Sequence, residues 1–362
     1  MRLAVDAREL ENRPTGVGRV VQGLLEAWPI DELVLISRQP VGLTPRLSGR
    51  PSLCAQVVYS GGWMPGALWE QLVLPRAVAS CAADALLAPG YGMPRMTSVP
   101  TAVCMHDCAP FALRNEFSWR EGIRRRWNAH NAARRAAFLF MGSHFAAAEA
   151  KRYLGVASDR CLVSPWGLTA GFGEPDENSV AQVRAKYGID AKTVLFVGSG
   201  FQRRGLDALA RRVNSVAQRV PGTRLAVAGR SHAEGPTTST DDAPVVRLGY
   251  VPEFDLPALY AACGVVAYPS TYEGFGLPVL EALACGSPVV GSRSATLVEV
   301  FGEHATLVPH EDDNAWIDAL ARALETHDRE ANEAAAWARA QRWEPTAAAV
   351  RERLLEQVEG AR

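Results

Sequence analysis

Residues 265–282 read VVAYPSTYEGFGLPVLEA. An unbroken apolar run from Val265 to Tyr268 precedes a loop with two glycines, and Pro278 then suits the first turn of a helix. Continuous rather than alternating apolar residues are typical of a strand that is covered on both faces. This stretch therefore predicts one strand–loop–helix unit of a parallel sheet with helices on either side.

Short apolar runs of this kind recur along the whole chain, separated by stretches of helical length. They predict strands near residues 2–6, 33–37, 54–58, 85–88, 101–105, 137–141, 160–163, 193–198, 223–228, 245–248, 264–268, 287–291 and 305–308. A break at Ser164–Gly167, followed by a Gly- and Pro-bearing stretch, leaves seven of these runs before it and six after it. We therefore expect two α/β domains with doubly wound parallel sheets, over residues 1–165 and 166–345. The remaining residues, 346–362, predict a helix after Pro345 that packs back on the first domain.

Length and charge agree with this plan and exclude other classes. At roughly 150 residues per domain, 362 residues make two domains. With 38 basic and 39 acidic side chains, the chain lacks the overall positive charge of a non-specific nucleic-acid binder. Asp6 interrupts the first apolar run, and no run is long enough for a membrane span. Seven cysteines, an odd number, fit a reducing compartment, so we expect a soluble, cytoplasmic protein.

One segment departs from this charge balance. Residues 114–152 contain nine basic and three acidic side chains, together with Trp119 and Trp127. This combination is compatible with peripheral contact between the segment and the inner face of an anionic membrane. The alternative is a solvated helix face whose tryptophans pack inward.

Two glycine-bearing segments could bind an anion. PTGVGR at residues 14–19 precedes an apolar helix expected over 20–28, so Gly16 and Gly18 would let backbone N–H groups approach a phosphate. GSGFQRRG at residues 198–205 follows a buried strand and precedes a helix expected over 206–220. Both segments lack the third glycine of a dinucleotide fingerprint, which disfavours a nicotinamide-dependent oxidoreductase. A plain structural turn remains the alternative for the first segment.

Arg203 and Arg204 stand at the start of a helix, where the helix dipole disfavours positive charge. Two guanidinium groups in that position would neutralise a diphosphate, with at least one of them placed for bidentate contact. The sequence thus favours a diphosphate ligand at this loop.

The loop in the opening stretch also has the composition of a ligand site. Gly274 and Gly276 permit backbone conformations that expose amide groups, and Glu281, one turn into the helix, can point toward the same space as Glu273. A carboxylate accepts two hydrogen bonds from vicinal hydroxyls, so ribose and hexose are the natural ligands.

His106 lies in CMHDC, residues 104–108, at the end of a predicted strand. Cys-x-His-x-Cys suggests zinc, but no other Cys/His pair stands at a helpful spacing, so we expect no metal. A histidine at the carboxyl end of a parallel strand is placed for ligand binding, with a buried structural histidine as the alternative.

The ordered set of motifs resembles the GT-B glycosyltransferases of family 4, which are retaining and use nucleotide-sugars. The motifs that carry this resemblance are VDAREL (5–10), PTGVGRVV (14–21), WEQ (69–71), HD (106–107), PF (110–111), SHF (143–145), LGYVPEFDLPALYAACGVVAYPS (248–270), EGFGLPVLEALACGSPVVGS (273–292), VEVFGEHATLVPHED (298–312) and WEPTA (343–347). The most specific of them is the pair of glutamates eight residues apart, Glu273 and Glu281. The resemblance implies two Rossmann-like domains that face each other across a cleft, with the donor held mainly by the second and the acceptor mainly by the first.

The resemblance also implies roles for individual residues. Glu281 would hold the ribose, Arg203 and Arg204 the diphosphate, and Gly16 and Gly18 would offer amides to the same phosphates. The catalytic pair would be Glu273 and His106, which would surround the donor sugar together with the loop formed by Gly274, Phe275, Gly276 and Leu277. The family usually has lysine where this chain has Arg204.

No metal or other cofactor is expected, since the family is metal-independent. The implied reaction transfers a hexose, with mannose from GDP-mannose favoured, to a glycan or lipid-linked glycan acceptor in bacterial surface polysaccharide synthesis. A UDP-glucose or UDP-N-acetylglucosamine donor, or an inactive nucleotide-binding assembly partner, are the alternatives. No nucleic-acid partner is expected.

Overall fold

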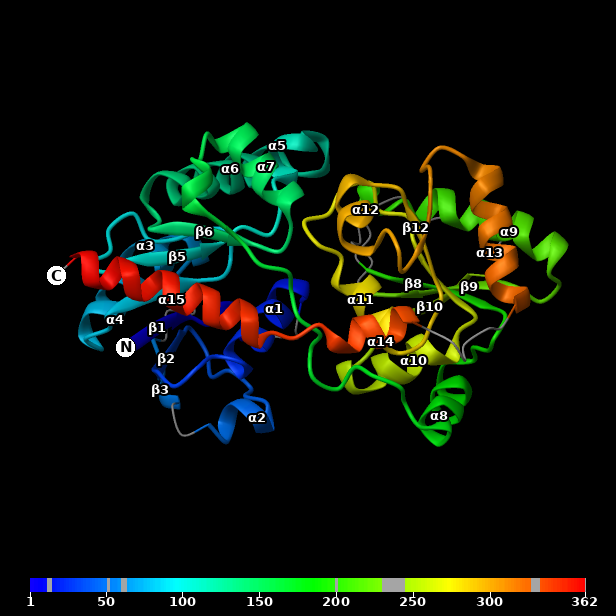
Figure 1. The fold of residues 1–362 in the computed structure, drawn as a ribbon, viewed down its shortest axis with the longest axis horizontal. Coiled ribbons are helices and arrows are strands. Elements are labelled where there is room, and N and C mark those ends of the chain that lie inside the picture. Colours follow the sequence, from blue (N-terminus) through cyan, green and yellow to red (C-terminus); the bar gives the residue numbers. More distant parts are fainter. Residues whose placement is uncertain are drawn as a thin grey trace. The chain divides into compact units, whose positions relative to one another are not determined.

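The computed structural model describes residues 1–11, 15–50, 53–59, 64–198, 201–229, 245–326 and 333–361. The chain divides into two compact units (Figure 1). The first consists of Met1–Thr169 together with Arg342–Arg362, and the second of Ala170–Gln341. The sequence placed the two boundaries at 165 and 345, which is four residues away from each observed boundary.

The first unit is built on a seven-stranded sheet in the order β3-β2-β1-β4-β5-β6-β7, and every pairing is parallel. Its strands are β1 (Arg2–Asp6), β2 (Glu32–Ser37), β3 (Leu53–Val58), β4 (Ala85–Ala88), β5 (Thr101–Cys104), β6 (Phe138–Met141) and β7 (Cys161–Val163). The strand order reverses between β1 and β4, so the loops that follow these strands diverge and leave space at the carboxyl edge of the sheet.

The second unit holds a six-stranded parallel sheet in the order β10-β9-β8-β11-β12-β13. Its strands are β8 (Thr193–Val197), β9 (Arg224–Ala228), β10 (Val245–Gly249), β11 (Val265–Tyr268), β12 (Val289–Ser292) and β13 (Thr306–Val308). Here the order reverses between β8 and β11, and every residue of these two strands is buried. The thirteen strands and the doubly wound parallel plan predicted from continuous apolar runs are confirmed.

Helices cover both sheets. Those of the first unit are η1 (Arg8–Leu10), α1 (Gly16–Glu26), α2 (Pro45–Ser48), α3 (Gly66–Leu72), α4 (Leu74–Ser80), α5 (Ala109–Ala112), η2 (Arg114–Glu116), α6 (Trp119–Arg135), α7 (His144–Leu154), η3 (Ser158–Arg160) and α15 (Glu344–Ala361). Those of the second unit are α8 (Glu177–Tyr187), η4 (Gln202–Arg204), α9 (Leu206–Arg219), η5 (Glu253–Asp255), α10 (Leu256–Ala262), α11 (Leu277–Ala284), α12 (Ala295–Phe301), α13 (Asp313–Thr326) and α14 (Glu333–Ala340). Within the described residues, no helix combines the length and the apolar character that a membrane span requires.

The last helix, α15, lies with the first unit, beside α1 and β5 (Figure 1). The indole of Trp343 stacks on that of Trp166 with ring centroids 5.8 Å apart. Arg351 donates two hydrogen bonds to the fully buried carboxylate of Asp31, at 2.6 and 3.0 Å. These contacts fix the C-terminal segment on the sheet that begins the chain.

Candidate active site

Two of the predicted motifs meet at the carboxyl edge of the second sheet. Because β8 and β11 are neighbours, the loop after β8 and the loop after β11 leave the sheet side by side. The Thr271 amide donates a hydrogen bond to the carbonyl of Arg203 at 3.0 Å, which joins the two loops directly. Of the first motif, Ser199 and Gly200 lie outside the described residues.

Arg204 and Glu273 form the ionic centre of this edge. Nε of Arg204 lies 3.0 Å from Oε1 of Glu273, and both side chains are largely buried. Nη1 of Arg204 donates to the Tyr268 hydroxyl at 2.9 Å, and the Ser270 hydroxyl donates to Oε1 of Glu273 at 2.6 Å. The Thr296 hydroxyl also donates to the backbone carbonyl of Glu273 at 2.5 Å. Glu273 is thus neutralised and held in one orientation before any ligand binds.

Burial raises the pKa of Tyr268 well above its ordinary value, so its hydroxyl stays protonated. The sequence reasoning gave no role to Tyr268 or to Thr296. Tyr268 is the last residue of β11, a position that faces the carboxyl edge in any parallel sheet, and this was the available signal. Thr296 comes from α12, 23 residues after Glu273, and nothing in the local sequence links the two.

Two left-handed glycines shape the loops. Gly205 has φ 64°, and a Cβ there would lie 2.9 Å from the Pro269 carbonyl oxygen, so α9 can begin against the neighbouring loop only with glycine at this position. Gly276 has φ 110° and stands just before α11, whose first turn contains Pro278 as predicted.

The loop from Gly274 to Leu277 would offer a ligand its backbone rather than its side chains. Gly274 is buried, and so are Phe275 and Leu277, with the Phe275 ring edge-on to that of Phe301 at 5.8 Å. The apolar side chains therefore anchor the loop, and main-chain groups form whatever surface it presents to a ligand.

Glu281 has a different environment from Glu273. Its side chain is fully buried in α11, and Oε2 accepts a hydrogen bond from the Tyr260 hydroxyl at 3.0 Å. The expected shared orientation of the two glutamates toward one ligand is not visible in their contacts, because one faces Arg204 and the other faces Tyr260. The ribose role of Glu281 stays a prediction, and it requires Glu281 to become accessible.

Arg203 lies beside Arg204 in η4, with its guanidinium carbon 5.0 Å from the centre of the Phe201 ring. Each arginine thus lies over an aromatic ring, Arg203 over Phe201 and Arg204 over Tyr268 at 5.5 Å, and Arg204 is also paired with Glu273. Both remain at the carboxyl edge of the sheet, where an anion would approach.

His106 occupies the carboxyl end of β5 in the first unit. Its Nε2 lies 2.7 Å from the carbonyl oxygen of Pro89. A carbonyl only accepts, so Nε2 carries the proton and Nδ1, which lies 3.8 Å from the Cys104 sulfur, is the acceptor. Burial lowers the pKa of His106, so the imidazole is neutral at neutral pH.

The neighbouring cysteines do not form a metal site with His106. Burial raises the pKa of the Cys104 and Cys108 thiols well above the ordinary value, which keeps both protonated. Zinc binds the thiolate. Among the described residues, no group of three or more His, Cys, Asp or Glu side chains is placed to hold a metal ion.

The start of α1 is packed more tightly than we expected from the sequence. The helix begins at Gly16, earlier than expected, because the Thr15 hydroxyl caps it by accepting from the Gly18 amide at 3.2 Å. A Cβ on Gly18 would lie 2.8 Å from the Glu9 carbonyl oxygen, so close packing explains that glycine. Gly16 is exposed with open space around it, and as the first helical residue it is the better placed of the two to meet an anion. Pro14 lies outside the described residues.

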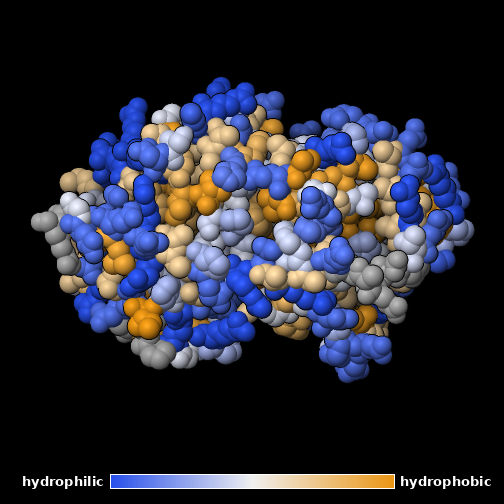
Figure 2. All heavy atoms as spheres, in the orientation of Figure 1, coloured by the Kyte–Doolittle hydropathy of each residue, from blue (hydrophilic) through white to orange (hydrophobic). Residues whose placement is uncertain are grey.

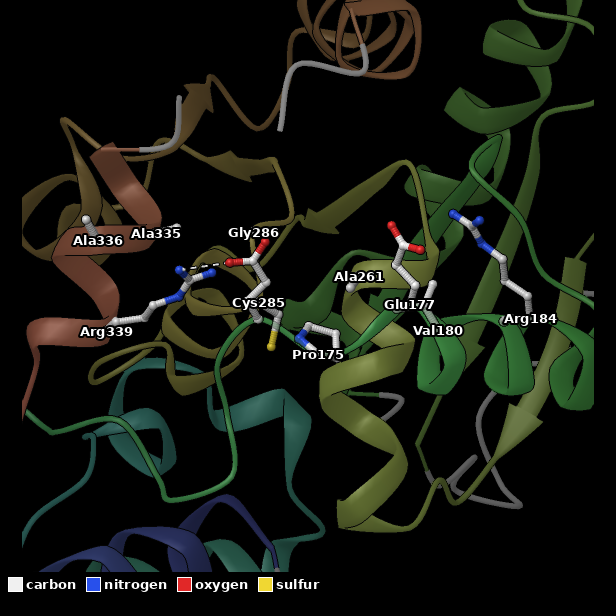
Figure 3. Close-up of a pocket in the computed structure, with 12 residues that line it drawn as sticks. Pro175, Glu177, Val180, Arg184, Ala261, Cys285, Gly286, Ala335, Ala336 and Arg339 are labelled. Carbon is white, nitrogen blue, oxygen red and sulfur yellow. Dashed lines mark ion pairs between the residues drawn. The ribbon is translucent and has the colours of Figure 1, made fainter. Parts of the chain in front are cut away.

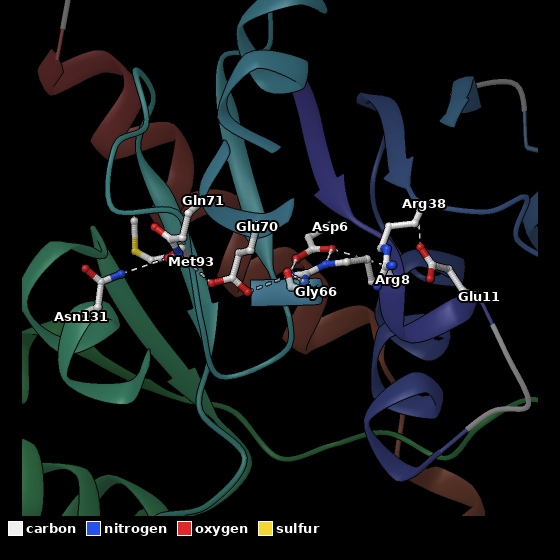
Figure 4. Close-up of polar contacts among 9 residues, drawn as sticks. All are labelled: Asp6, Arg8, Glu11, Arg38, Gly66, Glu70, Gln71, Met93 and Asn131. Carbon is white, nitrogen blue, oxygen red and sulfur yellow. Dashed lines mark hydrogen bonds and ion pairs between the residues drawn. The ribbon is translucent and has the colours of Figure 1, made fainter. Parts of the chain in front are cut away.

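A buried ionic cluster lies at the same edge of the first sheet (Figure 4). Arg8 donates to both oxygens of Asp6, at 2.8 and 2.6 Å, to Glu70 at 2.7 Å and to the Gly66 carbonyl at 3.0 Å. Burial alone would lower the pKa of Arg8, but the two carboxylates raise it above its ordinary value. Gln71 continues the network by donating to Glu70 at 3.1 Å. The WEQ motif thus supplies α3 with the polar side chains that tie it to the end of β1.

A cavity of about 890 Å³ lies elsewhere in the second unit (Figure 3). Its lining includes Arg184 and Arg339, which donate to the Ala262 and Ala284 carbonyls and so cap the C-terminal ends of α10 and α11. Burial raises the pKa of Cys285, which also lines it, to about 12. None of the predicted site residues lines this cavity, and its arginines have structural partners.

Comparison with known proteins gives the site its context. Residues 191–326, all in the second unit, match the family described as "Glycosyl transferases group 1". The chain is 56% identical over 73 residues to the O-antigen chain mannosyltransferase B of Escherichia coli, which covers 20% of this chain and 18% of that protein. It is 27% identical over 262 residues to the serotype-specific mannosyltransferase WbdA of E. coli, covering 65% of this chain and 32% of that one.

A GDP-mannose-dependent alpha-(1-6)-phosphatidylinositol monomannoside mannosyltransferase of Mycolicibacterium smegmatis is 32% identical over 179 residues, with 44% and 45% of the two chains covered. The matched part therefore spans less than half of each of these relatives. Among solved structures, Anabaena Alr3699/HepE in complex with UDP and glucose superposes with a TM-score of 0.74 over 98% of this chain and 100% of that one, at 18% identity.

Two doubly wound parallel sheets of seven and six strands give this chain the GT-B fold. Within that fold, residues 191–326 are similar to the group 1 glycosyltransferases.

Proposed function

We propose that this protein transfers a hexose, mannose in the first instance, from a nucleoside diphosphate sugar to a hydroxyl of a glycan or lipid-linked glycan in bacterial surface polysaccharide synthesis. The observation that carries the proposal is the Arg204–Glu273 pair, held at the carboxyl edge of the second sheet next to Arg203 and a loop anchored by Phe275. The mannosyltransferase relatives favour mannose, and the M. smegmatis relative favours GDP as its carrier.

In this proposal the diphosphate binds at the two arginines. The charge that develops on the leaving nucleoside diphosphate is met by donors already fixed in place, an arrangement that is worth several kcal/mol in enzymes of many kinds. Arg204 is anchored on Glu273 and Tyr268, so little ordering of its side chain is needed when substrate arrives. Glu281 takes the ribose hydroxyls.

Glu273 and His106 act on the sugar as orienting groups. Glu273 is bound by Arg204 and Ser270, which makes it a poor nucleophile and a good fixed hydrogen-bond acceptor. His106 is neutral and donates its Nε2 proton to the Pro89 carbonyl, so in this proposal it orients the sugar through Nδ1 and supplies no positive charge. We therefore propose transfer with retention, in which the acceptor hydroxyl attacks from the face that the diphosphate leaves, and without a metal ion.

The decisive experiment is a donor screen followed by turnover. Thermal unfolding is measured with GDP, UDP, ADP, CDP and dTDP, because a ligand at 100 times its Kd stabilises the folded state by about 2.7 kcal/mol. We expect stabilisation by GDP, and release of GDP from GDP-mannose when acceptor is added, unchanged by EDTA. Selective stabilisation by UDP would support the UDP-sugar alternative, and a strict requirement for Mn²⁺ would contradict the metal-free mechanism.

An assembly partner without catalytic activity is the second candidate. The intact Glu273, Glu281 and His106 speak against it, and turnover measured with Glu281→Gln separates the two. For the enzyme, this variant loses transfer but keeps its association with other proteins, whereas for an assembly partner there is no transfer to lose.

The proposal includes a peripheral contact of segment 114–152 with an anionic membrane at the cytoplasmic face, where a lipid-linked acceptor would be found. The structure of α6 in this segment allows that contact to be specified further.

A further inference from the structure

Helix α6 has an unusual distribution of side chains between its two faces. Its buried residues are Gly122, Ala129, Asn131, Ala132 and Ala133. Its exposed residues are Trp119, Arg120, Ile123, Arg124, Trp127, His130, Arg134 and Arg135. A surface helix ordinarily buries its large apolar residues and exposes its polar ones. Here glycine, alanine and one asparagine face the protein, and the largest apolar side chains face away from it.

The three large apolar residues form one stripe. Trp119, Ile123 and Trp127 are spaced four residues apart, which places them on the same side of a helix. Their exposed fractions are 70%, 51% and 44%. The sequence left open whether the tryptophans pack inward, and the structure places them on the surface.

Positive charge surrounds this stripe. The guanidinium of Arg120 lies 5.5 Å from the ring centre of Trp119, and that of Arg95 lies 5.7 Å from the ring centre of Trp127. Among the exposed residues of α6 there is no carboxylate, and Glu121 is paired with Arg125 at 2.7 Å. Strongly hydrophilic residues are visible along the upper edge of the first unit, where α6 and α7 lie (Figure 2).

We propose that the exposed face of α6 docks on an anionic lipid bilayer, with the helix in the plane of the surface. Trp119, Ile123 and Trp127 enter the region between headgroups and acyl chains, while the arginines contact lipid phosphates. Tryptophan prefers that region, and arginine keeps its charged end at the phosphates while its stem lies on apolar surface. The proposal specifies the membrane contact included in the proposed function, and it does not depend on the identity of the donor sugar.

Charge complementarity selects a membrane over a second copy of the chain. Two copies meeting through this face would bring two sets of arginines together without a carboxylate among the exposed residues of either helix. An anionic bilayer instead satisfies the apolar stripe and the arginines at the same time.

Docking here would place the acceptor side of the fold near the lipid surface. Trp119 comes thirteen positions after His106 in the chain, and Nη1 of Arg126 donates to the Pro110 carbonyl at 3.1 Å. Helix α6 is thus tied to the segment that follows the His106 loop. A sugar carried on a membrane lipid would be presented to the same unit that contacts the membrane.

The test is co-sedimentation of the full chain with vesicles of phosphatidylcholine alone or mixed with phosphatidylglycerol. We expect binding to the mixed vesicles that weakens as salt is added. Replacing Arg120 or Arg124 by alanine should weaken it about five-fold each, and Trp119→Ala with Trp127→Ala should abolish sedimentation. Matched controls are Phe254→Ala, an exposed aromatic of the second unit, and Arg211→Ala, an exposed arginine of α9, which should bind like the parent protein.

Three results would overturn the proposal: no binding of the parent protein to anionic vesicles, equal binding of the α6 variants, or self-association that the α6 variants abolish in sedimentation velocity. Transfer to a water-soluble acceptor, measured without vesicles, reports on the proposed function separately. A variant that loses vesicles and keeps this transfer leaves the enzyme assignment intact, whereas absence of transfer in the parent protein removes the assignment and leaves the docking result standing.

Discussion

Arg204 and Glu273, which stand 69 positions apart in the chain, form an ion pair at 3.0 Å where β8 and β11 end side by side. The pair joins the arginine loop to the glycine loop, the two segments from which a diphosphate and a sugar would be held. Its two members therefore have a structural role and a chemical role that experiments can separate.

Glu273→Gln should lower kcat by about 10²- to 10³-fold, the range found when one fixed transition-state contact is removed. The amide keeps the shape of the carboxylate and its hydrogen bond from Ser270, but it no longer neutralises Arg204. Steady-state kinetics of GDP release provide the measurement, with Glu303→Gln, an exposed glutamate of the second unit, as control. Unchanged kcat in the Glu273 variant would remove this residue from the catalytic pair.

Arg204→Lys tests the unusual arginine. Lysine retains the charge but cannot contact Glu273 and the Tyr268 hydroxyl together in the same planar geometry. We expect KM for the donor to rise several-fold, with a smaller effect on kcat. A larger fall in kcat than rise in KM would show that Arg204 acts mainly in the transition state.

The buried pair of Glu281 and Tyr260 distinguishes ribose binding from a structural role. If Glu281 holds ribose, Glu281→Gln weakens GDP binding, measured by calorimetry, while Tyr260→Phe does not. Tyr260→Phe should instead lower the free energy of unfolding by about 1–3 kcal/mol, since it removes a hydrogen bond donated to a buried carboxylate. Equal weakening of GDP binding by both variants would indicate that the pair only supports α11.

The low pKa of His106 predicts a pH dependence of stability. In the folded protein, burial holds the pKa below the ordinary 6.5, so the unfolded chain binds the proton more readily. The contribution of neutral His106 to the free energy of unfolding is therefore complete above pH 6.5 and is lost as the pH falls below that value. In denaturant titrations at several pH values, the free energy of unfolding of His106→Gln should fall less steeply below pH 6.5 than that of the parent protein. His310, whose pKa burial also lowers, contributes in the same direction, so His310→Asn is measured in parallel.

The ion pair between Asp31 and Arg351 allows the attachment of α15 to the first unit to be tested. Burial alone would raise the pKa of Asp31, but hydrogen bonds from Arg351 help to lower it below the ordinary 3.8. The contribution of ionised Asp31 to the free energy of unfolding is therefore present above that pH and is lost as the pH falls through the pKa of the folded state. Asp31→Asn should cost about 2 kcal/mol of unfolding free energy at neutral pH. Glu352→Gln, an exposed change on the same helix, should cost almost nothing. Equal stability of both variants would contradict the attachment.

The parallel sheets could be predicted because each strand carries its own signal. Runs such as Val194–Val197 are apolar on both faces, and this local property needs no knowledge of partners. The glycine loop after β11 was predictable for the same reason.

Partnerships between distant segments were not predictable. Arg8 meets Glu70 across 62 positions, and Glu281 accepts a hydrogen bond from Tyr260, 21 positions before it. The sequence left open whether Trp119 and Trp127 pack inward, because only packing against the protein decides which face of α6 is covered. Small residues such as Ala132 occupy the covered face.

The packing of α15, the last helix of the chain, on the first unit has a consequence for synthesis on the ribosome. The second unit is one uninterrupted stretch, Ala170–Gln341, and can close as soon as it emerges from the exit tunnel. The first unit has to wait, because Val350 and Leu354, both fully buried, arrive nearly two hundred residues after its last strand. During that interval the nascent first unit carries an uncovered apolar strip, and chaperones would be expected to engage it there.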